Sequence, residues 1–143
     1  GEQRLIDFVF NRARSYVFST APPPSICAAA AAAIDIVRAD SQSRGQLLSS
    51  AQQLRQRLQI QGWDTGLSES QIVPIVIGSA TETMTLTQQL RGQGILAPGI
   101  RPPTVAPGTS RIRISLTAGH QPADLDHLVE CLGQIASQPN RPS

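Results

Sequence analysis

Three consecutive prolines at residues 22–24 constrain the fold of this chain more than any other feature. Proline has a fixed φ and no backbone N–H, so it blocks a helix before it but is tolerated in the first turn of a helix. The following segment, residues 25–38, includes six consecutive alanines and is apolar on every side. Because a helix without a polar face is normally buried, we predict a buried helix there, preceded by a short extended run at residues 16–20.

The remaining patterns alternate between helix and strand. A helical period runs over residues 42–61, and Gly62 is expected to end that helix. Ser79 and Glu82 have capping-box spacing and predict a short helix that ends at Gly92. Further helices are predicted from Leu5 to about residue 14 and over residues 122–136, and strands over residues 72–77, 94–100 and 111–116. This order predicts an α+β fold, with a roughly three-stranded, mainly antiparallel sheet covered by helices and preceded by long helices.

The composition argues against several classes of function. The chain has 143 residues and a formal net charge of +2, and its arginines are scattered, so a nucleic-acid-binding surface is not expected. Aromatic residues make up only 3% of the chain, so stacking platforms for bases are scarce. No apolar run has the length of a membrane span. Cys27 and Cys131 lie in helical patterns without a signal peptide, so we expect reduced, buried thiols in a cytoplasmic protein.

The clearest strand, residues 111–116, has the pattern of a binding surface. Side chains alternate along a strand, so Arg111, Arg113 and Ser115 share one face while the residues between them point to the core. The two arginines are then about 7 Å apart, and each guanidinium can bind a carboxylate through two parallel hydrogen bonds. The same pattern also fits an ordinary solvated face of a half-buried sheet. The residues alone leave both interpretations open.

A stiff segment precedes this strand. Pro102 and Pro103 restrict the backbone beside Arg101 and would present the Thr104 hydroxyl in one geometry. Such stiffness favours a substrate contact, because a reacting group must be met in a fixed orientation. Prolines also rigidify loops that bind nothing, so this interpretation has an equally simple alternative.

A second candidate for an anion site lies before the proline triplet. The hydroxyls of Ser19 and Thr20 are near the expected start of the helix over residues 25–38. Free N–H groups at a helix N-terminus attract anions such as phosphate. An ordinary helix N-cap explains the same residue types. Both interpretations stay open.

The two histidines show no metal-ligand spacing. Neither His120 nor His127 has a Cys or His cluster around it. We expect His127 on the surface of the last helix and His120 as a cap at the start of that helix. A nucleophile elbow and a Gly-rich phosphate loop are also absent from the sequence. The residues alone therefore predict an anion-binding α+β module without a metal site.

Several motifs together resemble the C-terminal part of the α-oxoamine synthases. These motifs are residues 16–24 (YVFSTAPPP), 101–105 (RPPTV), 108–109 (GT), 111–113 (RIR) and 116–120 (LTAGH). The RPPTV version is most similar to that of the 8-amino-7-oxononanoate synthases, whereas sister enzymes such as glycine C-acetyltransferase, 5-aminolevulinate synthase and serine palmitoyltransferase tend to have tyrosine-proline there. One departure is Ala106, which separates the Thr-Val pair from the proline that usually follows it directly.

The resemblance implies an enzyme of pyridoxal 5'-phosphate (PLP) fold type I that works as a homodimer. The 8-amino-7-oxononanoate synthases condense pimeloyl-CoA with L-alanine, with decarboxylation, in biotin biosynthesis. By the same resemblance, Thr104 contacts substrate and Arg113 pairs with the amino-acid carboxylate, with Arg101 as another candidate for carboxylate recognition. Ser19 or Thr20 would reach the cofactor phosphate of the neighbouring subunit.

One departure from the family is decisive for the chemistry. The family's Schiff-base lysine belongs to the large domain, and this sequence has no lysine. We therefore expect a C-terminal fragment that is inactive alone and has no covalently bound PLP. Its expected parts are the end of the large domain and a linking helix (1–40), the small domain (41–136) and a disordered tail (137–143). Two alternatives stay open: another α-oxoamine synthase, of the glycine C-acetyltransferase type, or a stand-alone, non-catalytic module that binds a ligand or a partner.

Overall fold

The computed structural model describes residues 1–137. The tail predicted to be disordered, residues 137–143, lies outside the described residues except for Ser137. The hydroxyl and the backbone N–H of Ser137 both donate to the Gly133 carbonyl and close the last helix. The chain forms two compact units, Gly1–Asp40 and Ser41–Ser143, and each has its own architecture.

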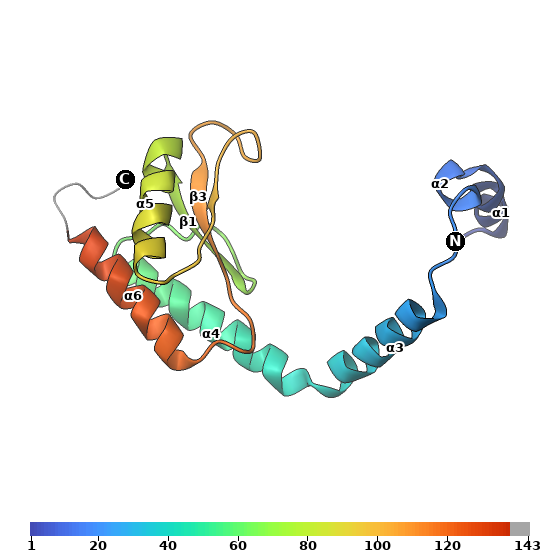
Figure 1. The fold of residues 1–143 in the computed structure, drawn as a ribbon, viewed down its shortest axis with the longest axis horizontal. Helices are drawn as coiled ribbons and strands as arrows, with labels where there is room; N and C mark the ends of the chain where they lie inside the picture. Colours follow the sequence, from blue (N-terminus) through green and yellow to red (C-terminus); the bar gives the residue numbers. More distant parts are fainter. Residues whose placement is uncertain (138–143) are drawn as a thin grey trace. The chain divides into compact units, whose positions relative to one another are not determined.

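The first unit is entirely helical. It consists of α1 (Gln3–Arg12), α2 (Arg14–Val17) and α3 (Pro24–Ala39), labelled in Figure 1. Pro24 is the first residue of α3, which confirms that the prolines open a helix rather than interrupt one.

The extended run predicted at residues 16–20 is wrong at its start. The backbone N–H groups of Tyr16 and Val17 both donate to the Ala13 carbonyl, and this turn forms α2. The rings of Phe10 and Tyr16 lie with their centroids 5.1 Å apart, in a tilted arrangement favourable for aromatic pairs. This aromatic contact therefore accompanies a helical turn where the sequence pattern had predicted an extended segment.

The prediction that α3 is buried is also wrong for the described chain. No residue of α3 is buried; Ile36 is 68% exposed, and the Cys27 thiol, expected inside, is exposed as well. The helix forms because alanine has the highest intrinsic helix propensity. Burial, in contrast, needs a second surface, which the residues of this unit do not provide.

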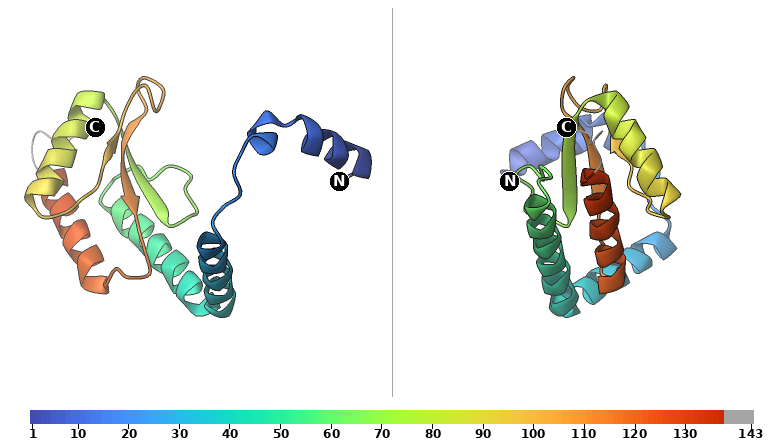
Figure 2. Two further views of the ribbon diagram at one scale, coloured as in Figure 1. Left: turned by 45° about the vertical axis from the view of Figure 1, so that its right-hand side comes forward. Right: turned by 90° about the vertical axis from the view of Figure 1, so that its left-hand side faces the viewer.

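The second unit is a two-layer α+β structure, which confirms the predicted fold class. Its elements are α4 (Ser41–Ile60), β1 (Ile72–Gly78), α5 (Ala80–Gly92), β2 (Gly99–Ile100), β3 (Ser110–Ser115) and α6 (Pro122–Ala136). The strands form an antiparallel sheet in the order β1-β3-β2. The three helices cover one face of this sheet (Figures 1 and 2).

The strand register determines which side chains reach the core. Ile75 of β1 lies opposite Ile112 of β3, and both are fully buried beneath the helices. Pro74 lies opposite Arg113 on the other face. Because β1 is an edge strand, the missing N–H of this proline does not interrupt the sheet.

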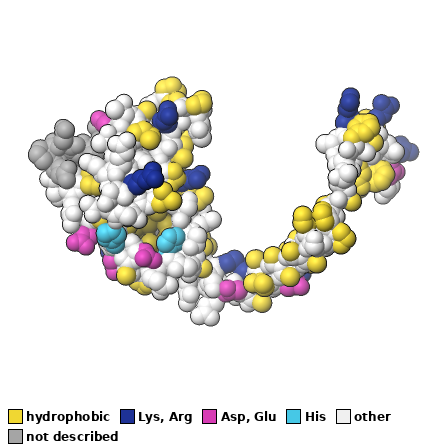
Figure 3. All heavy atoms as spheres, viewed as in Figure 1, with side chains coloured by type: hydrophobic (Ala, Val, Ile, Leu, Met, Phe, Trp, Pro, Cys, Tyr) yellow, Lys and Arg dark blue, Asp and Glu magenta, His cyan; other side chains and the backbone are white. Residues whose placement is uncertain are grey.

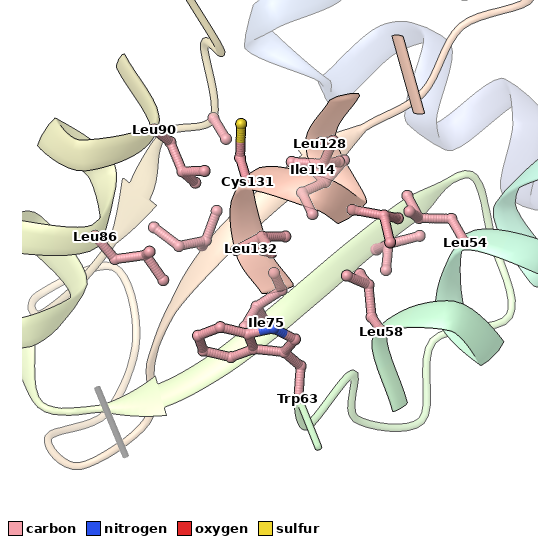
Figure 4. Close-up of a cluster of buried hydrophobic side chains, with 14 of the residues drawn as sticks. Leu54, Leu58, Trp63, Ile75, Leu86, Leu90, Ile114, Leu128, Cys131 and Leu132 are labelled. Carbon is pink, nitrogen blue, oxygen red and sulfur yellow. The ribbon is translucent and has the colours of Figure 1, made fainter. Parts of the chain in front are cut away.

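The core of this unit lies between the sheet and the three helices (Figure 4). Leu58 of α4, Leu86 of α5 and Leu132 of α6 are each completely buried. The helix predicted over residues 42–61 is confirmed, and its buried residues Ala51, Leu54 and Leu58 lie on one side of it. The helix predicted over residues 122–136 is also confirmed as α6; Leu125 is half-buried, and the core includes Leu128, Val129, Leu132 and Ile135.

Two helix ends in this unit lie where the sequence predicts them. Gly62 has φ +81°, and the N–H of Trp63 donates to the Leu58 carbonyl at 3.0 Å, so α4 ends in a Schellman motif. The Ser79 hydroxyl accepts a hydrogen bond from the Glu82 N–H at 3.3 Å and caps α5. Local sequence signals were therefore sufficient at these two ends.

The strand predicted over residues 94–100 is much shorter in the structure. Only Gly99–Ile100 (β2) has strand geometry. The Pro98 carbonyl still accepts the Arg113 N–H at 3.0 Å, but proline cannot donate in return and the ladder stops there. Gly94, with φ +79°, belongs instead to the turn after α5.

Candidate functional site

The polar side chains of β3 lie on the face of the sheet opposite the three helices. Arg113 and Ser115 are exposed and Arg111 is half-buried, while Ile112 and Ile114 between them are buried. This is the alternation that the sequence predicts. Arg113 lies on β3, the central strand of the sheet, and its backbone N–H donates to the Pro98 carbonyl at 3.0 Å. Within the described residues no group binds its guanidinium.

Arg111 has a different environment from Arg113, although the two share a face. Its Nε–H donates to the Thr109 carbonyl at 3.0 Å. Across the strands it lies between Val76 of β1 and Ile100 of β2. The sequence pattern treats the two arginines as equivalent, and the structure shows that only Arg113 presents an unengaged guanidinium to solvent.

Residues 101–109 form the loop that connects β2 to β3. Arg101 and Thr104 are both exposed on it. The Thr104 N–H donates to the Arg101 carbonyl at 3.0 Å, and the peptide bond between the two prolines of this segment is cis. The Thr109 hydroxyl donates to the Ala106 carbonyl at 2.8 Å and closes a second turn. The loop is therefore folded on itself as two consecutive turns.

Three of the five candidate residues thus come from one hairpin. Arg101 directly follows β2, Thr104 lies in the connecting loop, and Arg113 lies on β3. These three residues therefore follow one another within a single β2–loop–β3 hairpin. Their substrate contacts stay predictions.

Ser19 and Thr20 belong to the first unit, between α2 and α3, and both are exposed. The N-cap residue of α3 is Pro23, and no side chain caps this helix. The interpretation of Ser19 or Thr20 as an N-cap is therefore wrong. The Ser19 hydroxyl instead donates to the Tyr16 carbonyl at 3.1 Å. Their role as phosphate ligands stays a prediction.

His120 does not cap the last helix as expected. Its Nδ1 accepts the Thr117 N–H at 2.9 Å, within the turn after β3. The start of α6 is closed instead by Asp124, whose carboxylate accepts the Gln121 N–H at 2.8 Å. In this arrangement the first-turn carboxylate also has the favourable sign for a helix N-terminus.

A cavity of about 380 Å³ lies beside both histidines. Figure 3 shows the two histidine side chains on one face of this unit, with hydrophobic side chains between them. His127 is exposed, as predicted, and one ring nitrogen is 3.0 Å from the Gln93 carbonyl. Sequence analysis missed this hollow because its lining comes from the turn after α5, from β3 and from α6. No group of three His, Cys, Asp or Glu residues in the described part of the chain could hold a metal ion.

Among helices of the described residues, none is both long and apolar enough to cross a membrane.

Comparison with protein families gives one match that covers most of the chain. Residues 1–132 match the family model described as aminotransferase class I and II. The chain is also similar to the curated 8-amino-7-oxononanoate synthase 2 of Bacillus subtilis, with 43% identity over 138 residues. That alignment covers 96% of this chain but 36% of the relative, so the chain spans about a third of the length of this relative.

Solved structures have the same fold. A high-resolution structure of SPT with a PLP internal aldimine matches 92% of this chain at a TM-score of 0.81 and 28% identity, with 33% of that chain covered. An 8-amino-7-oxononanoate synthase from Francisella tularensis matches 92% of this chain at a TM-score of 0.78 and covers 38% of that structure. At 20% identity, this second likeness concerns the fold alone.

The family assignment therefore rests on the sequence match over residues 1–132, on the α+β fold and on the residues shared with the synthases. The chain belongs to the aminotransferase class I and II family, and within it corresponds to part of a PLP fold-type-I α-oxoamine synthase, most like the 8-amino-7-oxononanoate synthases.

Proposed function

We propose that this chain is the C-terminal portion of an 8-amino-7-oxononanoate synthase, which condenses pimeloyl-CoA with L-alanine, with decarboxylation, in biotin biosynthesis. The observation that carries the proposal is the 43% identity to a curated synthase over 96% of this chain. A glycine C-acetyltransferase type of activity is the alternative within the family. Curated relatives at 43–45% identity bear the 8-amino-7-oxononanoate synthase name, which favours the first activity.

The cofactor of the proposed enzyme would be PLP, which supplies an electron sink for chemistry at the α-carbon of the amino acid. Covalent PLP binding in this family needs a lysine, and the 143 residues contain none. The residues present therefore do not fit a covalent PLP site. We infer that the chain is inactive alone and that the lysine lies elsewhere in the complete enzyme.

Arg113 is the strongest candidate for binding the amino-acid carboxylate. Its guanidinium is exposed on the open face of the sheet, and the described residues leave it unengaged. A guanidinium forms two parallel hydrogen bonds with a carboxylate, and a central strand holds it in a fixed position. Arg101 and Thr104 are exposed on the adjoining loop and are proposed as further substrate contacts.

The division of the chain supports a proposal for its domains. Most contacts are made within either Gly1–Asp40 or Ser41–Ser143, so the chain divides into these two units. We assign residues 1–40 to the end of the large domain and a linking helix, and residues 41–136 to the small C-terminal domain. In a homodimer, Ser19 or Thr20 would contact the cofactor phosphate of the neighbouring subunit. The exposure of both hydroxyls is compatible with such a contact.

The test uses the complete enzyme that contains this chain, assayed for CoA release with L-alanine and pimeloyl-CoA. Replacing Arg113 with Gln removes the charge and the guanidinium fork, so the KM for alanine is expected to rise about ten- to hundredfold. Arg91→Gln is the matched control, because Arg91 is an exposed arginine on the outside of α5. The control is expected to keep the alanine KM of the parent enzyme.

Three results would contradict the proposal. An unchanged alanine KM in Arg113→Gln would remove the role of this residue. Efficient turnover of glycine with acetyl-CoA, but not of alanine with pimeloyl-CoA, would assign the glycine C-acetyltransferase type instead. CoA release from pimeloyl-CoA and L-alanine by the isolated 143-residue chain, supplied with PLP, would show that the fragment is active without the missing lysine.

A further inference from the structure

The loop that carries Arg101 and Thr104 has few attachments to the sheet. Its two internal turns are closed by the Thr104 N–H bond to Arg101 and by the Thr109 hydroxyl bond to Ala106. Both partners of each bond lie within the loop, so these bonds shape the loop without attaching it to a strand. Any precise placement of Thr104 therefore requires contacts between the loop and the strands.

One such contact comes from Arg111, at the base of the loop. Arg111 pairs with Ile100, the last residue of β2, so it lies beside the point where the chain leaves the sheet. Its Nε–H donates to the carbonyl of Thr109, where the chain returns, at 3.0 Å. The residue is half-buried, with Val76 of β1 and Ile100 of β2 as its neighbours across the strands.

A second contact lies next to the first. Gly78, at the end of β1, has φ +85°, and a Cβ placed on it would be 3.3 Å from the Gly108 carbonyl. The backbone of the loop thus passes close to β1 at Gly108. The returning half of the loop therefore lies close to β1 at Gly108 and is bonded at Thr109 to the Arg111 side chain of β3.

We propose that Arg111 is a positioning residue: its Nε–H, bound to the Thr109 carbonyl, fixes the loop of residues 101–109 so that Thr104 meets the substrate in one geometry. This inference rests on the proposed function, which makes Thr104 a substrate contact. It separates the two neighbouring arginines by role, with Arg113 binding an anion directly and Arg111 acting through the loop.

Three substitutions of Arg111 distinguish a hydrogen bond from a charge. In Arg111→Gln, the Nε2 amide nitrogen occupies the place along the side chain that Nε has in arginine, so the donor is kept and the charge is lost. In Arg111→Lys the charge is kept, but a carbon occupies that place. Arg111→Met keeps an unbranched apolar stem and has neither donor nor charge.

The measurements are hydrogen–deuterium exchange of the peptide containing residues 101–110 and steady-state kinetics, both in the complete enzyme. We expect Arg111→Gln to preserve loop exchange and KM within about twofold. Arg111→Lys and Arg111→Met are expected to accelerate exchange of the loop. They are also expected to raise about tenfold the KM of the same substrate whose KM Thr104→Val raises, since a misplacement near 1 Å can have large kinetic effects. Their kcat is expected to fall less than their kcat/KM, whereas a general loss of folding would lower the amount of active enzyme without moving KM.

The outcomes separate this inference from the proposed function. If Arg111→Lys preserves KM and loop exchange while Arg111→Gln does not, Arg111 acts through its charge and the positioning role is overturned. Normal exchange and kinetics in all three variants, or defects in all three, would overturn it as well. If Thr104→Val has no effect on any KM, the proposed substrate contact itself fails, whatever the exchange data show for Arg111.

Discussion

The two units of this chain differ in how their apolar residues are placed. In Gly1–Asp40, no helix contains a buried residue, and large side chains such as Phe8, Phe18 and Ile36 are between 62% and 76% exposed. In Ser41–Ser143, leucines from three helices close over a sheet and are inaccessible. The comparison shows that apolar sequence becomes a core only where a second layer lies opposite it. The first unit has helices without such a layer.

The largest difference in unfolding behaviour is expected when the two units are produced as separate pieces. A peptide of residues 1–40 buries no side chain of its own, so we expect no cooperative unfolding transition from it. A chain starting at Ser41 keeps the whole described core and should unfold cooperatively in urea, with the midpoint of the full chain. Circular dichroism of both pieces measures this. Loss of cooperativity in the piece that starts at Ser41 would show that the second unit depends on the first.

Replacing one leucine with alanine in each unit should show the same difference in burial at single positions. Leu58 is completely buried in α4, so Leu58→Ala removes core contacts and leaves a cavity, and should lower the free energy of unfolding by about 2–5 kcal/mol. Leu5 in α1 is 59% exposed, and Leu5→Ala should change it by less than about 0.5 kcal/mol. Urea titration of the 143-residue chain measures both. Equal losses for the two variants would mean that Leu5 is packed against a surface in solution.

A smaller effect is expected where β2 passes α5 within the second unit. A Cβ on Gly99 would lie 2.7 Å from the Thr87 hydroxyl oxygen and 3.0 Å from the Thr83 side chain, so Gly99→Ala requires the strand, the helix or these threonine side chains to shift. We expect a loss of about 1–3 kcal/mol of unfolding free energy.

Gly45 provides the control for this substitution. It lies within α4, and a Cβ there would meet no atom within 4 Å, so Gly45→Ala should stabilise the chain by about 0.5–1 kcal/mol. Thermal melts of the two variants would move in opposite directions. A Gly99→Ala protein as stable as the parent would show that β2 can move away from α5 without loss.

The sequence predicted most of the second unit because its signals there are local. Alternation along residues 111–116 identified which side chains are buried, and Gly62 and Ser79 marked two helix ends. The sequence predicted residues 94–100 less well, because the pattern there indicated a strand over the whole segment. Pro98 limits the ladder there, and the turn after α5 takes up the residues before it.

By itself, then, the sequence determined the α+β class, the positions of the long helices and the face of β3 that carries Arg111 and Arg113. Residue periodicity is sufficient for these features, because the period of 2 in a strand and of 3.6 in a helix is a property of the backbone. Only the tertiary structure distinguished the two arginines: Arg111 donates to Thr109 and Arg113 points to solvent. That difference depends on how residues 101–109 fold back onto the sheet, and two equal residues in one alternating pattern contain no information about it.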